Sequence, residues 1–284
     1  MEMKERPLFI DVSSHQTYID LSKSVAGKVH GVIMRAVCGL SKDVDFVAFD
    51  NYYDWGELYR GSYAALWPQY NVLDQVNKWF EVDPAGYLYM EDAELDNGME
   101  PKDVAHKIVN MSERVLERSG KRPWLYGAYW FLMVNLVPFV TEGWLNEHWF
   151  VLAQYNDGDA IEDNISIILP DKIHIDRVAF QQTTGQAELY PGSGNVDRDR
   201  FLLGEEEELH DFMAEYFGVG PVDPPIVPPV DCEEQVAQAV ALCNAECEKR
   251  IADLLLVQEL EVNMVIKKAN NQALQNLINP HIIP

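Results

Sequence analysis

The sequence predicts an α/β protein in which a β/α barrel is followed by a proline-rich linker and a C-terminal α-helical segment. Strand-like apolar runs alternate with helical patterns through residues 1–217, an order typical of a parallel sheet. Seven or eight strands in about 215 residues favour a closed barrel over an open sheet. The composition changes sharply at residues 218–230, and one helical pattern fills residues 231–284.

The elements of the barrel can be read in order along the chain. The strand-like runs cover residues 7–13, 31–37, 61–67, 86–94, 124–130, 149–155 and 177–183. The clearest helical pattern covers residues 100–121, where Pro101 suits the first turn and Gly120 the C-terminal stop. The apolar face of this helix is expected to comprise Val104, Ile108, Met111 and Val115. Core positions are expected for Trp124, Trp130 and Trp149.

Residues 218–284 differ in composition from the barrel. Five prolines between Pro221 and Pro229 predict a stiff, extended linker. Apolar side chains then recur at spacings of three and four from Val236 to Leu254, which predicts an amphipathic helix. Because a single helix cannot bury its own stripe, we expect residues 231–278 to self-associate, as in a coiled coil, or to dock onto a partner protein.

Charge and composition exclude several classes of partner. The net charge of −24, from 22 basic and 46 acidic residues, disfavours nucleic acids and anionic membranes and is compatible with a neutral sugar chain. No apolar run is long enough to span a membrane, and the N-terminal residues lack the hydrophobic region of a secretory signal peptide. None of the seven histidines lies in a metal-ligand motif, so no metal and no cofactor is expected.

Several of the strand-like runs end on polar residues. They are Asp11, Arg35, Asp92, Glu94, Gln154, Tyr155, Gln181 and Gln182. In a β/α barrel the carboxyl ends of the strands converge on one mouth. Asp92 and Glu94 are two residues apart and point to the same side of a strand, whereas Glu91 points away. Two facing carboxyl groups suit glycoside hydrolysis, in which one is kept protonated and the other is kept ionised. Repulsion between the two groups would raise the pKa of one of them. The alternative is a divalent-ion site formed with Asp96.

An ordered set of motifs resembles glycoside hydrolase family 25, the Chalaropsis-type lysozymes or muramidases. "FIDVSSHQTYIDLS" resembles the opening D-x-S-x-x-Q-x-x-I-D of that family, and "YMEDAE" resembles its L-D-x-E strand. "RGSYAALWP", "WLYGAYWF" and "HWFVLAQY" are similar to three further strands, and "VAFQQTTGQAELYPGSGNVDRDRF" is similar to the closing motif. The match spans roughly residues 8–204, nearly the whole predicted barrel.

The resemblance implies an irregular, TIM-like β/α barrel that cleaves the β-1,4 bond between N-acetylmuramic acid and N-acetylglucosamine. It implies that Glu94 is the general acid/base, that Asp92 stabilises or orients the intermediate, and that Asp11 and Asp197 are the other two acids of the cleft. The nucleophile is either a carboxylate or the acetamido group of the substrate. Candidate substrate-binding residues are Tyr63, Tyr126, Tyr155, Gln154, Gln181 and Arg35, with plain core packing as the alternative for the three tyrosines.

Two departures from the family motifs concern the mouth. The closing W-Q-Y-S has become Phe180-Gln181-Gln182-Thr183, and V-D-x-N has become Val196-Asp197-Arg198-Asp199, which adds an acid and a base there.

The prediction is a peptidoglycan hydrolase of the phage endolysin type. It would reside in the host cytoplasm before lysis or in a virion, and would act on the bacterial cell wall. The alternative is a catalytically weak or inactive glycan-binding or structural virion protein on the same barrel. Residues 218–284 contain no Trp, Tyr or Phe, so stacking on sugars is unavailable to them and we expect no cell-wall binding there.

Overall fold

The computed structural model describes the barrel and not residues 218–284. It covers residues 6–16, 19, 29–46, 58–84, 86–155, 167–188 and 195–217. The predicted linker at 218–230 and the predicted helical segment at 231–284 lie outside these residues, so both stay predictions, as does the domain boundary between them.

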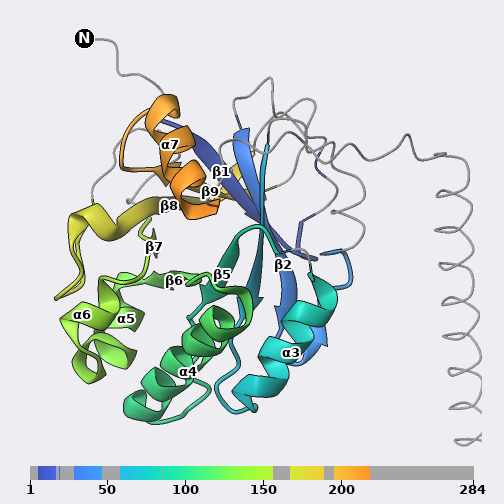
Figure 1. Cartoon of the computed structure of the whole chain (residues 1–284), viewed down its shortest axis with the longest axis vertical. Coiled ribbons are helices and arrows are strands. Elements are labelled where there is room, and N and C mark those ends of the chain that lie inside the picture. The colour runs from blue at the N-terminus through green and yellow to red at the C-terminus, as the bar shows by residue number, and fades with distance from the viewer. Residues whose placement is uncertain are drawn as a thin grey trace, which may run out of the picture. The chain divides into compact units, whose positions relative to one another are not determined.

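Eight strands form a closed, mixed β-barrel (Figure 1). They are β1 (Leu8–Val12), β2 (Val29–Cys38), β4 (Tyr59–Ala65), β5 (Tyr89–Asp92), β6 (Trp124–Ala128), β7 (Phe150–Ala153), β8 (Val178–Glu188) and β9 (Asn195–Phe201). Their order is β1-β9-β8-β7-β6-β5-β4-β2, and parallel pairing of β1 with β2 closes the barrel. A two-residue strand, β3 (Ser41–Lys42), extends β2 as a hairpin. The predicted barrel is confirmed.

The last strand, β9, was not among the predicted strand-like runs, and it departs from the parallel arrangement of the other barrel strands. β9 runs antiparallel to both β8 and β1. Only residues 189–194 connect β8 to β9, which is too short for the crossover that a parallel pair requires. The sequence pattern of alternating strands and helices therefore fails at this point, where β9 follows β8 as its antiparallel neighbour.

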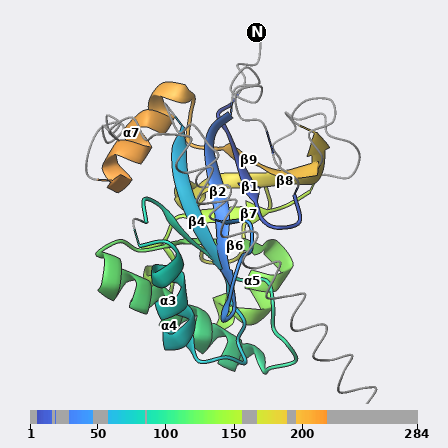
Figure 2. The ribbon, with the colours of Figure 1, turned by 90° about the vertical axis from the view of Figure 1, so that its right-hand side faces the viewer.

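Helices cover the outside and one end of the barrel. They are α3 (Val72–Val82), α4 (Pro101–Ser119), α5 (Tyr129–Asn135), α6 (Glu142–Leu145) and α7 (Glu206–Phe217), with short 3-10 turns η1 (Val137–Phe139) and η2 (Ile175–Arg177). Helix α3 packs beside α4, and α7 lies on the opposite side of the barrel (Figures 1 and 2). No helix among the residues described is long and apolar enough to cross a membrane.

Helix α4 is confirmed in detail. Pro101 is its first residue, and Gly120 ends it with a positive φ of 74°, a left-handed conformation that glycine adopts without strain. The four residues of the predicted apolar face are all fully buried.

The barrel has two cores. The outer core lies between the strands and helices such as α4. The inner core fills the barrel and includes Phe9, Ile33, Met90, Trp124, Phe180 and Phe201. Side chains of α7, among them Leu209 and Phe212, belong to this inner core beside Trp124, the first residue of β6. Helix α7 therefore closes the amino-terminal end of the barrel, which leaves the carboxyl ends of the strands for the polar side chains.

One core prediction is wrong. Trp124 is fully buried and Trp149 packs partly buried against the inner core, but Trp130 is 62% exposed. Trp130 lies in the first turn of α5, and the next two residues, Phe131 and Leu132, provide the buried face of that helix. The predicted strand at 124–130 ends at Ala128, so strand alternation does not apply to position 130.

Candidate active site

Five acids gather at the carboxyl end of the barrel. Asp11 lies on β1, Asp92 ends β5, Asp197 and Asp199 lie on β9, and Glu94 follows β5 by two residues. The four strand acids alternate with inner-core residues such as Phe9, Met90 and Phe201, so they face the barrel interior. In the β1–β9 ladder Asp11 is directly opposite Asp197. We call these five residues the acid cluster.

Asp92 and Glu94 form a carboxyl pair. Asp92 is 9% exposed, whereas Glu94 lies exposed at the mouth. Burial, the charge of Glu94 and a hydrogen bond between the two carboxyls raise the pKa of Asp92 well above its ordinary value. Burial also raises the pKa of Glu94, although the hydrogen bond opposes it. The contact between the two carboxyl groups therefore favours the protonated form of Asp92 and the ionised form of Glu94.

Gln182 connects Asp11 to two tyrosines. Its Nε2 donates to Asp11 Oδ2 at 2.8 Å, and its Oε1 accepts from the hydroxyls of Tyr126 at 2.8 Å and Tyr155 at 2.5 Å. Gln182 is 2% exposed and Tyr126 is 7% exposed, but Tyr155 is 56% exposed at the mouth. These bonds fix the orientation of the Gln182 amide and place a donor on Asp11.

Asp197 lies against the backbone of β8. A Cβ atom at Gly185 would come within 2.6 Å of Asp197 Oδ1 and 3.7 Å of the Tyr155 hydroxyl, so only glycine permits this approach. Burial and the charge of Glu94 raise the pKa of Asp197 to about 6.

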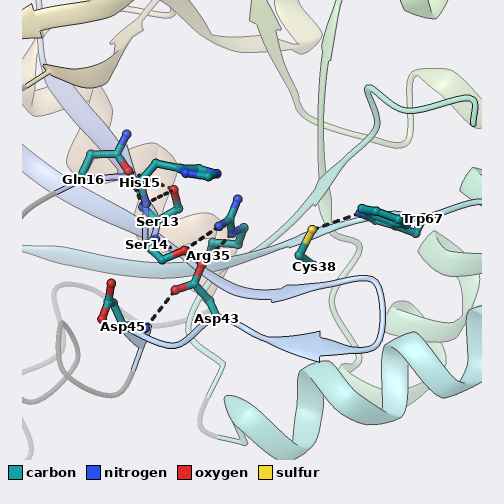
Figure 3. Close-up of polar contacts among 9 residues, drawn as sticks. All are labelled: Ser13, Ser14, His15, Gln16, Arg35, Cys38, Asp43, Asp45 and Trp67. Carbon is teal, nitrogen blue, oxygen red and sulfur yellow. Dashed lines mark hydrogen bonds and ion pairs between the residues drawn. The ribbon is translucent and has the colours of Figure 1, made fainter. Parts of the chain in front are cut away.

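The turn after β1 and the cation Arg35 form a polar network next to the acids (Figure 3). The Ser13 backbone N–H and hydroxyl both donate to Gln16 Oε1, at 2.7 and 3.0 Å, which fixes the turn. Arg35 on β2 donates to Ser14 Oγ at 2.9 Å and from Nε to Asp43 Oδ2 at 2.7 Å. Its positive charge opposes the rise in the pKa of Asp92, which burial dominates.

The predicted substrate-binding residues divide into three groups. Arg35, Tyr126 and Tyr155 contact or act on the acid cluster, as described above. Tyr63 is 8% exposed in the inner core, and burial followed by the charges of Asp11 and Asp92 raises the pKa of its hydroxyl. Gln154 and Gln181 instead bond elsewhere: Gln154 Oε1 accepts from the Ile168 N–H, and Gln181 Nε2 donates to the Gln154 carbonyl.

Gln182 and Asp199 are the site residues that the sequence prediction did not select. Gln181 and Gln182 are adjacent on β8, so only one can face the interior, and Phe180 of the inner core shares the face of Gln182. The alternation Phe180–Gln182 was the available signal. For Asp199 the signal was its spacing of two from Asp197, which places both acids on one face of a strand.

The alternative ion site with Asp96 does not form. Asp96 Oδ1 accepts the Gly98 N–H at 3.0 Å in the turn after β5, where Asn97 and Gly98 both have positive φ. Across the described ranges, no group of three or more His, Cys, Asp or Glu residues is arranged to hold a metal ion.

The structure is similar to solved lysozymes. A lysozyme from Streptomyces coelicolor superposes with a TM-score of 0.64 at 18% identity, covering 76% of this chain and 100% of that chain. A family 25 glycosyl hydrolase from Bacillus anthracis gives 0.58 at 18% identity, covering 74% and 94%. The catalytic domain of an endolysin from a bacteriophage of Listeria monocytogenes gives 0.57 at 16% identity, covering 76% and 98%. The chain matches no protein-family sequence model and no curated protein. The likeness establishes the fold, which is the barrel that the motif resemblance implied.

Proposed function

We propose that the protein is a peptidoglycan hydrolase, an N-acetylmuramidase that cleaves the β-1,4 bond between N-acetylmuramic acid and N-acetylglucosamine. The observation that carries this proposal is the acid cluster at the carboxyl end of a barrel shared with muramidases and an endolysin. Glycoside hydrolysis needs one carboxyl group that can deliver a proton and another that stays ionised.

The Asp92–Glu94 pair is suited to proton delivery. Glu94 is its exposed member, so it can reach a glycosidic oxygen, while the buried Asp92 keeps a proton within the pair. As the C–O bond breaks, Glu94 passes the proton of the pair to the leaving oxygen. Hydrolysis ends when water supplies a hydroxyl to the anomeric carbon and returns a proton to Glu94. The enzyme then has the same protonation state as before the reaction.

The remaining acids are suited to stabilise positive charge. The anomeric carbon becomes cationic in the transition state, and ionised carboxylates nearby lower its energy. Asp197 lies at the mouth end of β9, and Asp11 is held by the Gln182 amide. The nucleophile is either a carboxylate of the protein or the acetamido group of the substrate.

The exposed Tyr155 is the strongest candidate for a sugar contact. Tyr155 is 56% exposed, whereas its hydroxyl donates a hydrogen bond to Gln182. A ring held in this way loses little side-chain freedom when a sugar packs on it. Tyr63 and Tyr126 are buried, so we assign them to support of the acids.

We further propose a phage-type lytic role, supported by the likeness to an endolysin catalytic domain. Residues 231–278 would then mediate self-assembly or attach the enzyme to a partner such as a virion component.

Clearing of purified peptidoglycan tests the activity. The wild-type protein should lower the turbidity of a peptidoglycan suspension, and Asp92→Asn should clear it far more slowly, because an amide at position 92 cannot keep an exchangeable proton beside Glu94. Failure of a folded wild-type protein to clear any peptidoglycan type would overturn the proposed function.

A further inference from the structure

We propose that the stacked rings of Trp67 and Tyr70 form a further sugar-binding subsite on the rim of the mouth. We call these two residues the ring pair. The subsite would hold an N-acetylhexosamine of the glycan strand at a distance from the bond that is cleaved. The substrate rests on the proposed muramidase function, whereas binding of an oligosaccharide to the ring pair can be measured without cleavage.

The ring pair begins directly beyond the carboxyl end of β4, one strand away from Asp92. In the parallel β4–β5 ladder Ala65 is in register with Asp92, and the Leu66 N–H donates to the Asp92 carbonyl at 3.0 Å. Tyr63 belongs to the inner core and Leu66 to the outer core, so alternation places Trp67 on the inner face. Trp67 therefore leaves the strand on the side of the mouth.

The turn after β2 supports both rings from the neighbouring strand. The β2–β4 ladder shifts its register just before Val37, which belongs to the outer core, so the next residue, Cys38, faces the interior. The Trp67 indole N–H donates to Cys38 Sγ at 3.0 Å (Figure 3). A Cβ atom at Gly39, which has a positive φ of 59°, would lie 3.0 Å from the Tyr70 ring and 3.1 Å from the Trp67 ring. Both rings therefore pack closely on this turn.

Side chains from two helices hold the backbone of the ring pair. Gln75 on α3 is 1% exposed, and its Oε1 accepts the Trp67 N–H while its Nε2 donates to the Trp67 carbonyl, both at 3.0 Å. The same carbonyl accepts the Tyr70 N–H at 3.0 Å, which closes a turn. Lys107 Nζ on α4 donates to the Tyr70 carbonyl at 3.1 Å. The rings are thus held in place before any ligand binds, so binding orders few groups.

The rings stay partly open to solvent. Their centroids are 5.8 Å apart and their planes are parallel within 7°. Tyr70 is 38% exposed and Trp67 is half-buried. Leu40 in the turn after β2 and Leu95 after β5 are 43% and 39% exposed. Exposed aromatic faces among apolar side chains complement the flat C–H face of a β-linked N-acetylhexosamine.

Continuity with the acid cluster identifies the occupant. A glycan strand whose scissile bond lies over Asp92 meets the ring pair when it continues across β4, because adjacent strands are only about 4.8 Å apart. The two aromatic side chains carry no charge, which suits a neutral sugar. We therefore assign a sugar of the substrate strand to the ring pair, and not a segment of another protein.

Calorimetric titration with chito-oligosaccharides tests the subsite. The protein is the full chain with Glu94→Gln, which prevents cleavage, and the probes are the β-1,4-linked disaccharide and tetrasaccharide of N-acetylglucosamine. The tetrasaccharide should bind more tightly, because the longer chain can span the acid cluster and the ring pair. Adding Tyr70→Ala should weaken its binding by about threefold to tenfold and reduce the advantage of the longer chain.

Three further variants separate the flat ring from other effects. Tyr70→Phe keeps the ring and should bind like the parent protein, whereas Tyr70→Leu keeps apolar bulk without a flat face and should bind as weakly as Tyr70→Ala. Phe139→Ala removes a ring of similar exposure, 42%, from η1 and should leave binding unchanged. Equal affinities of the parent protein and a folded Tyr70→Leu for the tetrasaccharide would overturn the subsite. No binding of the tetrasaccharide by the folded parent protein would overturn it too.

Kinetics with Glu94 in place test the subsite on the natural polymer. Tyr70→Ala should raise the apparent KM for peptidoglycan by a similar factor and keep kcat within about twofold, because the ring pair does not touch the reacting atoms. A fall in kcat at unchanged KM would contradict a binding role. A folded wild-type protein that cleaves no peptidoglycan, together with tetrasaccharide binding that depends on Tyr70, would refute the muramidase function and leave the subsite standing.

Discussion

Glu94 is the residue on which the proposed chemistry depends most directly, because it is the exposed member of the Asp92–Glu94 pair. Replacing it by Gln keeps the shape of the side chain but removes the proton that passes to the leaving oxygen. We expect Glu94→Gln to lower the rate of peptidoglycan cleavage by about 10²-fold or more, with an unchanged circular dichroism spectrum and Tm close to wild type. Near-full activity would remove Glu94 from the mechanism.

Gly185 tests whether the position of Asp197 matters. In Gly185→Ala the new Cβ would lie within 2.6 Å of Asp197 Oδ1, so the carboxyl group must move. We expect a loss of about tenfold or more in kcat, since small displacements of a catalytic group are costly, with KM less affected. Gly143→Ala is the matched control, because its Cβ would meet nothing closer than 4.0 Å. Equal activity of the two variants would show that Asp197 tolerates displacement.

Which residues of the site could be predicted from the sequence depended on the direction of their strands. Asp11 and Asp92 could be placed because parallel strands end at one edge, so a polar residue after an apolar run marks the mouth. The sequence could not separate the roles of Gln181 and Gln182, because they depend on a one-residue alternation that two identical side chains do not reveal. The depth of Asp199 followed only from the antiparallel direction of β9.

At the scale of elements, β5 contains an unusual buried acid. Glu91 is fully buried in the layer outside the barrel, paired in register with Ala64 and Leu125, and within the described structure neither of its carboxyl oxygens has a hydrogen-bond partner. Burial and the charge of Asp92 raise its pKa well above the ordinary value. The strand thus carries a destabilising acid beside the catalytic one.

Glu91→Leu should therefore stabilise the protein. Removing an unsatisfied buried polar group is expected to raise the free energy of unfolding by about 1–3 kcal/mol at neutral pH. The gain should be smaller near pH 4.5, where the unfolded chain also protonates this glutamate. Urea unfolding at both pH values measures it, and a loss of stability at neutral pH would mean that Glu91 has a partner that compensates its burial.

The elements differed in how far the sequence determined them. Helix α4 carries its own start, stop and apolar period, so its bounds could be predicted from local signals alone. The direction of β9 and the exposure of Trp130 depend on neighbours: the first on a connection too short for a crossover, and the second on where β6 gives way to α5. The local sequence pattern therefore predicts neither the direction of β9 nor the exposure of Trp130.

At the scale of the whole molecule, the buried acids predict an unusual pH dependence of stability. Among the residues that the structure describes, six carboxyl groups have raised pKa values in the folded state: Asp11, Glu91, Asp92, Glu94, Asp197 and Asp199. Above the unfolded pKa values of 3.8 to 4.5 the folded state binds more protons than the unfolded chain, so stability falls as pH rises.

We expect the Tm to fall between about pH 4.5 and about pH 7, opposite to the usual acid denaturation. His148 acts in the other direction, because burial lowers its pKa to about 4, but it is one group against six. Differential scanning calorimetry across this range is the measurement. A Tm that rises toward neutral pH would show that the acids are ionised at little cost.

The predicted C-terminal segment also belongs to this scale. Cutting the chain at Gly220 and measuring mass by light scattering tests whether residues 231–278 drive self-assembly. We expect the full chain to form larger assemblies than the cut barrel, or to bind a partner protein that the barrel does not. Monomers in both cases, with an isolated tail that sediments with peptidoglycan, would contradict this proposal.

The identity of the new reducing end is the most direct test of the proposed function. Digested peptidoglycan is reduced with borohydride, hydrolysed, and analysed for its amino sugar alcohols. Cleavage by the acid cluster as a muramidase predicts muramitol as the new product, absent from digests with Glu94→Gln. Glucosaminitol, or no reducing end with a folded wild-type protein, would contradict the account.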